Sequence, residues 1–180
     1  MTLKLIGEEN NMNILLVSEK TLKERTLIND NVDGQYILPA IQICQDVDLQ
    51  TVIGPVLVKK LQALVADGSI ENNENKKYKD LLDNYITPYM CWQTMTAIQI
   101  NLNFKITNSG MIQNQDDRKN AIDYRSGKEL MAQYEKYANA YAMKLKNFLR
   151  ANVNKFPEYK QCENYECEED PQLCSIYLGK

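Results

Sequence analysis

One stretch of the chain decides the fold that we expect: SGKELMAQYEKYANAYAMKLKNFLRAN, residues 126–152. Its large apolar side chains recur at steps of three and four residues, which is the spacing of one face of an α-helix. They are Leu130, Tyr134, Tyr137, Tyr141, Leu145 and Phe148. Ser126 and Glu129 have the spacing of a capping box, so we predict that the helix begins there. A helix of this length extends for roughly 40 Å and needs an equally long partner to cover its apolar face.

The partner is predicted in the segment that begins at Lys76. Its apolar residues also follow helical spacing: Tyr78, Leu81, Leu82, Tyr85, Ile86, Tyr89, Trp92 and Met95. Pro88 lies inside this pattern and is expected to bend or break the helix near Tyr85, because proline has no N–H and its ring crowds the preceding turn. A row of aromatic residues also suits a ligand pocket, but it more often forms the core of an antiparallel helix pair.

After this segment the period of the pattern changes to two. Five apolar residues alternate with polar ones, as in a strand, although the first part also fits the end of the helix. They are Ile98, Ile100, Leu102, Phe104 and Ile106. Asn108-Ser-Gly110 is typical of a turn, so we predict a β-hairpin near residues 104–114. An isolated hairpin is barely stable in water, and we expect another surface to support it.

Two further helices are predicted in the first half of the chain. The turn at residues 31–34 can cap a helix from Gln35, with Pro39 in its first turn and a short turn after Asp46. Gly54-Pro55 suits the end of one helix and the start of the next. The buried face predicted for the second helix consists of Val56, Leu57, Leu61, Leu64 and Val65.

The two terminal segments are predicted to be extended. Residues 1–31 contain the apolar bursts 3–6 and 14–17, which predict an arm with one short strand and one short helix after Ser18. This arm either folds onto its own core or lies across a neighbouring subunit. Residues 161–180 form an acidic tail, and residues 32–160 lie between the two. The predicted fold class is therefore mainly α: an antiparallel long-helix bundle with a small β-hairpin and extended terminal segments.

The composition excludes several function classes. The chain has 180 residues, of which 44% are hydrophobic, and no apolar run is long enough to span a bilayer. It contains no histidine, which removes Ser–His and Cys–His nucleophiles and every zinc site that uses histidine. Its net charge of −3 argues against a broad phosphate-binding face. We expect no catalytic residue and no cofactor.

Two groups of residues have side chains that can ligate metals. Cys162, Cys167 and Cys174 lie in the acidic tail, but their spacing matches no zinc knuckle and a fourth ligand is missing. Cys44 and Cys91 lie within helical patterns and are expected to pack as small apolar groups. Asp116, Asp117 and Asp123 have the chemistry to hold a divalent ion, but a solvated charge run is the favoured interpretation. We predict no metal site.

The order of short motifs along the chain resembles a known family. The motifs are Asn31-Val-Asp33, a helix with Ile41, Gln45 and Asp46, Ile53-Gly54 before Leu57 and Leu61, Tyr85-Ile-Thr-Pro88, Lys105-Ile-Thr-Asn-Ser-Gly110, a helix with Tyr137, Ala138 and Tyr141, and Phe156-Pro157. This combination resembles the head–tail connector, or adaptor ring, proteins of tailed bacteriophages, with the closest likeness to those of crAss-like phages of Bacteroides. The resemblance covers roughly residues 12–159, and the tail from Gln161 departs from it.

The resemblance implies a structural role in the virion. Such proteins are mainly helical and form rings, commonly twelve-fold, beneath the portal through which DNA passes. It implies the portal and further tail or connector rings as partners, weak contact with DNA, no membrane, and assembly in the host cytoplasm. The implied inter-subunit surface comprises Phe104, Ile106, Asn108, Gly110, Met111, Ile112, Phe156, Pro157 and Tyr159.

Two other classes of function remain open. The first is a small DNA-packaging or nucleic-acid accessory protein, which normally has a basic stripe; the acidic balance of the chain counts against it. The second is a carboxylate-based metal enzyme that uses Asp116, Asp117 and Asp123.

Overall fold

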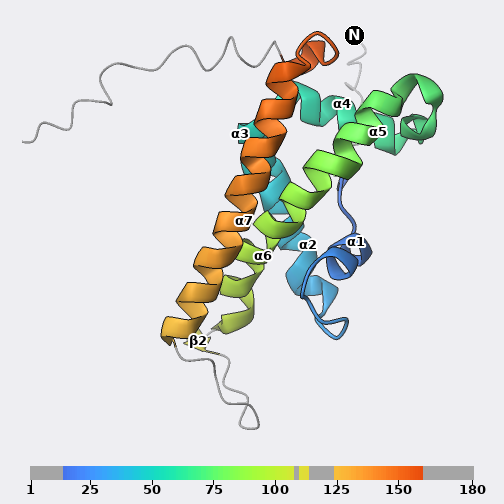
Figure 1. Cartoon of the computed structure of the whole chain (residues 1–180). Coiled ribbons are helices and arrows are strands. Elements are labelled where there is room, and N and C mark those ends of the chain that lie inside the picture. Colours follow the sequence, from blue (N-terminus) through green and yellow to red (C-terminus); the bar gives the residue numbers. More distant parts are fainter. Residues whose placement is uncertain (1–13, 108–109, 114–123, 160–180) are drawn as a thin grey trace, which may run out of the picture.

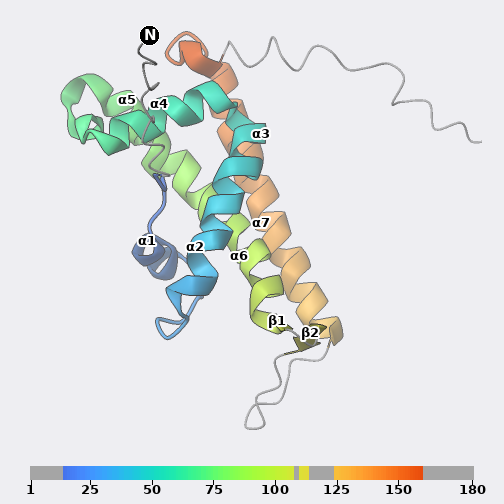
Figure 2. The ribbon, with the colours of Figure 1, turned by 180° about the vertical axis from the view of Figure 1, so that it is seen from behind.

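The computed structural model describes the backbone of residues 14–107, 110–113 and 124–159, and side chains up to Ile98 and again from Gly127 (Figure 1). The described chain is mostly helical, so the mainly-α prediction is confirmed. Its longest element, α7 (Tyr124–Ala151), runs along the molecule from the strands at one end to the helices α4 and α5 at the other (Figures 1 and 2).

The described part of the N-terminal arm, from residue 14 onward, folds onto the core of its own chain. Helix α1 (Glu19–Arg25) is capped by Ser18, whose Oγ accepts a hydrogen bond from the Thr21 N–H at 3.1 Å, as the sequence predicts. Leu16, Val17 and Leu22 are buried in the main hydrophobic cluster. Residues 14–17 form no strand, because their backbone groups bond to side chains instead. The other apolar burst, residues 3–6, lies outside the described residues.

A single long helical segment follows, and it contains a π-helical turn. It comprises α2 (Gly34–Ile43), η1 (Cys44–Leu49) and α3 (Gln50–Ile53), and the Asp33 carboxylate caps its start by accepting from the Gln35 N–H at 3.0 Å. The predicted break after Asp46 is therefore wrong. The wide turn of η1 adds one residue to the helical register, so that Cys44 and Leu49 are both buried although they are five positions apart. Pro39 is also misplaced in the prediction, since it is the sixth residue of α2.

Gly54 separates this segment from α4 (Pro55–Ala66). Its backbone has φ 82° and ψ 152°, a conformation that side chains other than hydrogen rarely allow. Pro55 is the first residue of α4, as predicted. The buried face of α4 differs from the prediction, because Val58 is buried, Val56 is 36% exposed and Val65 is only partly buried.

The chain then turns through two 3₁₀ turns, η2 (Ser69–Glu71) and η3 (Asn73–Asn75), into a second long helical segment. This segment comprises α5 (Lys76–Leu81), the π-helical η4 (Leu82–Ile86) and α6 (Thr87–Asn103). The chain stays helical across Pro88, because the widened turn of η4 directly before it accommodates the missing N–H and the bulk of the ring.

Helix α6 extends further than its alternating sequence predicts. Residues 98–103 are helical, which is the second of the two interpretations that the alternation left open, and Ile98 is buried. Strand β1 (Phe104–Thr107) follows and pairs antiparallel with β2 (Gly110–Gln113), with Phe104 opposite Gln113. Within the described parts of the chain these two strands form a sheet of their own.

Helix α7 returns alongside α6 (Figures 1 and 2). It begins at Tyr124, so Ser126 lies inside its first turn and the predicted capping box does not start it. Aromatic rings join the two helical segments: Trp92 lies 4.9 Å from Tyr137 between ring centroids, and Tyr85 stacks on Phe148 at 4.0 Å. The row of aromatic residues is therefore used for packing between helices.

Beyond α7 the chain folds back over residues 152–159. The Phe156 ring lies edge-on to Tyr78 at 5.6 Å, and the Tyr78 hydroxyl donates to the Glu158 carboxylate at 3.0 Å. Phe156 and Tyr159 are buried in the cluster that also holds Leu145 and Leu149. Both residues pack in the core of their own chain, and their implied place on an inter-subunit surface stays a prediction.

Candidate functional site

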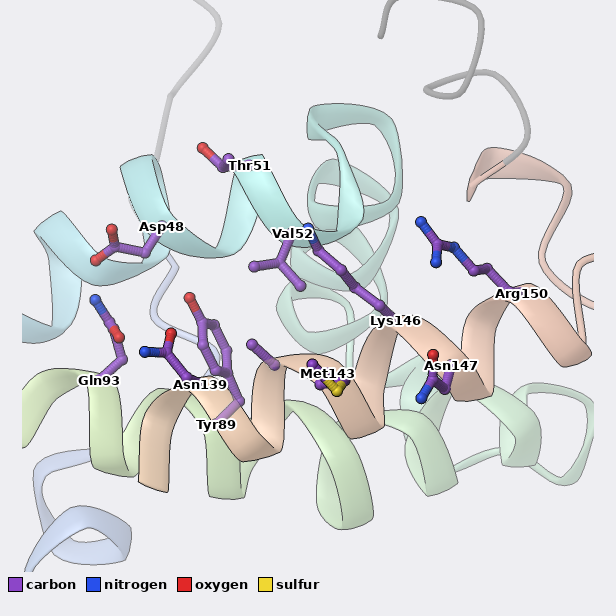
Figure 3. A pocket seen from close by; sticks show the side chains of 11 residues that line it. Asp48, Thr51, Val52, Tyr89, Gln93, Asn139, Met143, Lys146, Asn147 and Arg150 are labelled. Atoms are coloured by element: carbon purple, nitrogen blue, oxygen red, sulfur yellow. The ribbon is translucent and has the colours of Figure 1, made fainter. Parts of the chain in front are cut away.

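A groove lies between the first long helical segment and α7, with α6 at its floor (Figure 3). Its volume is about 560 Å³. It is lined by Asp48, Thr51, Val52, Tyr89, Gln93, Asn139, Ala142, Met143, Lys146, Asn147 and Arg150. Because the three helices come from distant parts of the chain, only the folded state brings these side chains together.

One part of the groove is polar and faces the core. Asp48 of η1 and Asn139 of α7 lie here with Tyr89 and Gln93 of α6 (Figure 3). Burial raises the pKa of Tyr89 far above its ordinary value, and the charge of Asp48 adds to this effect. Tyr89 is therefore neutral at ordinary pH, so it offers a hydrogen-bonding hydroxyl and no base or nucleophile.

The two buried thiols near the groove are not activated as nucleophiles either. Cys44 and Cys91 are buried, as predicted. Burial raises the pKa of Cys44 to about 12, with a further contribution from the charge of Asp48. Burial also raises the pKa of Cys91 to about 11, against a smaller opposite effect of Arg25. Both stay protonated near neutral pH, and a protonated thiol is a poor nucleophile and metal ligand.

The other part of the groove is basic. Lys146 and Arg150 lie one turn apart on α7, and both side chains extend along the groove in Figure 3. Neither forms an ion pair or hydrogen bond with any described residue. The sequence from Lys136 to Lys155 contains five basic residues and no acidic residue. Lys146 and Arg150 lie toward the end of α7, where the helix dipole favours positive charge. The described residues of the opposite wall do not neutralise them.

Between these parts the lining is apolar. Val52 of α3 and Ala142 and Met143 of α7 line it, and the Met143 side chain is 66% exposed. An apolar strip that ends at two unpaired cations is suited to an extended acidic segment with an aromatic or aliphatic residue. Among the described residues, no group of His, Cys, Asp and Glu is arranged to hold a metal ion.

The interface residues implied by the sequence do not meet at this groove. Phe104 and Ile106 lie in β1, and the corresponding residues of β2 are Gly110, Met111 and Ile112. Pro157 is exposed beside the buried Phe156, at the opposite end of α7 (Figure 1). Asn108 lies outside the described residues. So do the two groups considered as metal ligands, Asp116, Asp117 and Asp123 and Cys162, Cys167 and Cys174.

The groove is not predicted from the sequence. From the sequence of the helix alone, Lys146 and Arg150 fit partners of the helix dipole. The run without acidic residues from Lys136 to Lys155 is the signal that points to them.

The raised pKa values predict a loss of stability at alkaline pH. In the unfolded chain the thiols ionise near pH 9, whereas in the folded chain they stay neutral to about pH 11–12. The unfolded state therefore loses protons first, and the free energy of unfolding should fall as pH rises above 9, by up to about 1.4 kcal/mol per pH unit for each group. Burial, together with the hydrogen bond to Glu158, raises the pKa of Tyr78 from 10 to about 12, so the decline should steepen above pH 10.

Urea unfolding between pH 7 and 11 measures this decline. Cys91→Ala should make the decline in the free energy of unfolding shallower from pH 9 upward. Tyr78→Phe should make it shallower only from pH 10 upward. A free energy of unfolding that stays constant from pH 9 to 11 would contradict the assignment of these groups as buried and neutral.

The fold and groove define a mainly helical protein whose described site has a binding surface and no activated catalytic group. The chain belongs to a family of unknown function, DUF6712, whose match covers residues 49–169. Searches of curated proteins and of solved structures give no match. No helix within the described ranges is long and apolar enough to cross a membrane.

Proposed function

We propose that the protein is a structural component of a tailed-phage virion, a subunit of a ring that joins the portal to the tail and surrounds the DNA channel. The sequence resemblance supplies this class of function. The mainly helical fold and the long pair α6 and α7 are compatible with it. The role is structural and uses no catalytic residue.

The observation that carries the proposal is the small sheet at one end of the molecule. Strands β1 and β2 have four residues each, and no further strand pairs with either among the described residues. A two-stranded sheet has little stability of its own, and both outer edges offer free N–H and C=O groups. An edge of this kind is a natural site for pairing with a strand or terminal segment of a neighbouring subunit.

A closed ring requires two different surfaces on each subunit, because its contacts are heterologous. The strands lie at the start of α7, and the exposed part of the turn 152–159 lies at its other end (Figure 1). We assign the strand pair to one of the two contacts. The second contact is assigned to the turn 152–159. Phe156 and Tyr159 are buried there, so, of the residues that the resemblance implies in this turn, Pro157 is the one accessible to a neighbouring subunit.

Replacing residues 104–113 by a Gly/Ser linker of equal length should abolish ring assembly and leave the helices folded. The expected result is a loss of the high-mass species in mass photometry, with circular dichroism at 222 nm nearly unchanged. The reason is that a two-stranded sheet has little stability of its own, so we expect the helices not to depend on it.

Point variants provide the matched control. Phe104→Asp and Ile106→Asp alter the apolar set of β1, whereas Lys105→Asp alters the intervening position. We expect the first two to prevent assembly and the third to preserve it. Loss of the helical signal in the linker variant would instead assign the strands to the subunit's own core. A wild-type chain that stays monomeric and does not bind portal assemblies would overturn the proposal.

The acid-free run from Lys136 to Lys155 favours one other candidate, a nucleic-acid accessory protein. Salt-dependent binding to duplex DNA separates the two functions. A ring subunit beside the channel should bind weakly at physiological salt, whereas an accessory protein should bind tightly with a steep dependence on salt concentration.

A further inference from the structure

We propose that the groove between α3 and α7 is the docking site of the acidic segment at residues 161–170 of the same chain. This inference concerns a contact within one subunit and does not rest on the proposed ring. It assigns an occupant to the two unpaired cations of the groove.

Charge complementarity is the first argument. Residues 161–170 contain five acidic residues and no basic residue: Glu163, Glu166, Glu168, Glu169 and Asp170. The groove presents Lys146 and Arg150 on the side of α7, in the middle of a run of 20 residues without an acidic group. Carboxylates bound between two such cations form charge-assisted hydrogen bonds in a partly enclosed site, where salt screens less than at an open surface.

The reach of the chain is the second argument. Arg150 is the penultimate residue of α7, and Lys146 lies about 6 Å further back along the helix axis at 1.5 Å per residue. The described chain stops at Tyr159, after the turn that folds back over the end of α7. Seven residues from Tyr159 to Glu166 have a maximum span of roughly 24 Å, several times the separation of about 6 Å between the two cations along α7.

The apolar strip of the groove is the third argument. Tyr165 is the aromatic residue of the acidic segment and stands between Glu163 and Glu166. Val52 and Met143 offer an apolar surface beside the cations. An aromatic ring on that surface, with the carboxylate of Glu163 on the side of the cations, fits the order of apolar and basic groups along the groove. The carboxylate of Asp48 lies at the polar end, away from the cations in Figure 3, so it does not repel the segment where it is held.

Docking in the same chain is favoured over docking in a neighbour. A short tether gives the segment a local concentration in the millimolar range, which exceeds that of a free second chain. A docked segment also keeps Lys146 and Arg150 from phosphate groups, so docking is expected to lower the affinity of the chain for DNA.

Site-directed disulfide formation in the full chain tests the proposal. The background variant carries Cys162→Ser and Cys174→Ser, so that Cys167 is the remaining thiol of the segment. Met143→Cys places a partner in the groove, and Lys59→Cys places one at an exposed position of α4 as the matched control. Cys44 and Cys91 are buried and protonated, so they do not compete.

With diamide as the oxidant, the link from Cys167 to position 143 should form about tenfold faster than the link to position 59. Mass spectrometry of the monomer identifies the link. Lys146→Gln with Arg150→Gln should remove the difference, and so should about 1 M salt, where the screening length is about 3 Å. Lys59→Gln with Lys60→Gln is the control for loss of charge and should leave the rate at position 143 unchanged.

Three results would overturn the proposal. Equal rates at positions 143 and 59 would show that the segment has no preferred site. Links between two chains would assign the groove to the tail of a neighbouring copy. An unchanged rate after replacing the five acidic residues by Gln and Asn would remove the electrostatic basis of docking.

Discussion

Phe156→Ala should lower the free energy of unfolding of the isolated subunit by about 3–5 kcal/mol, the largest effect that we expect of a single substitution. The Phe156 side chain is 1% exposed, and its ring contacts Tyr78 at 5.6 Å and Phe148 at 6.1 Å between centroids. Removing it leaves a cavity at the point where the segment after α7 closes over α5. Urea unfolding followed by tryptophan fluorescence measures the loss, because Trp92 of α6 packs against Tyr134 of α7 and reports on the unfolding of this helix pair.

Pro157→Ala is the matched control, since Pro157 is the exposed neighbour of Phe156. It should change the free energy of unfolding by less than about 0.5 kcal/mol. The pair of variants distinguishes a core residue from an interface residue. If Phe156→Ala unfolded at the wild-type urea concentration but no longer assembled, the inter-subunit role implied by the sequence resemblance would be right and the packing described above would be wrong.

The elements that the sequence predicts well are those with local signals. Ser18 and Asp33 cap helices through bonds to residues two or three positions away, and Gly54-Pro55 combines a glycine conformation with a first-turn proline. These signals need no tertiary context, because both partners are close in the sequence. The tertiary packing of Trp92 against α7 also follows from helical spacing alone.

The π-helical turns could not be predicted, because they are set by packing between distant segments. In η1 the insertion of one residue buries Cys44, Gln45 and Leu49 together. A spacing of five matches neither the helical nor the strand period, so the sequence suggested a break instead. The alternation at residues 98–103 did not decide between strand and helix, because six residues are too few to separate the two periods.

The groove could not be predicted, because its walls are far apart in the sequence. Asp48 and Lys146 are 98 positions apart in the sequence and line the same groove only through the packing of α3 and α7. The basic run on α7 can be seen in the sequence. Whether its charges are neutralised depends on the residues of the opposite wall of the groove, which the sequence of α7 does not contain. Only the fold shows that no described acidic residue pairs with Lys146 or Arg150.

Gln45→Leu should lower the free energy of unfolding by about 2–3 kcal/mol and release the N-terminal segment. Gln45 is fully buried, its Oε1 accepts from the Leu16 N–H at 2.7 Å, and its Nε2 donates to the Ile14 carbonyl at 3.0 Å. Leucine preserves the volume but leaves the Leu16 N–H without a partner in an apolar setting. Urea unfolding measures the loss, and limited proteolysis should cut the chain near residues 14–18 faster than in the wild type.

Gln62→Leu is the control, because Gln62 Nε2 donates at 3.1 Å to the same Ile14 carbonyl from a partly exposed position. It should cost less than about 1 kcal/mol, since Gln45 still satisfies that carbonyl. The double variant should cost more than the sum of the single ones, because it removes both donors to Ile14 at once. Strict additivity would show that the two amides act independently. An unchanged proteolysis pattern in Gln45→Leu would show that the apolar contacts of Leu16 and Val17 alone hold the segment on the core.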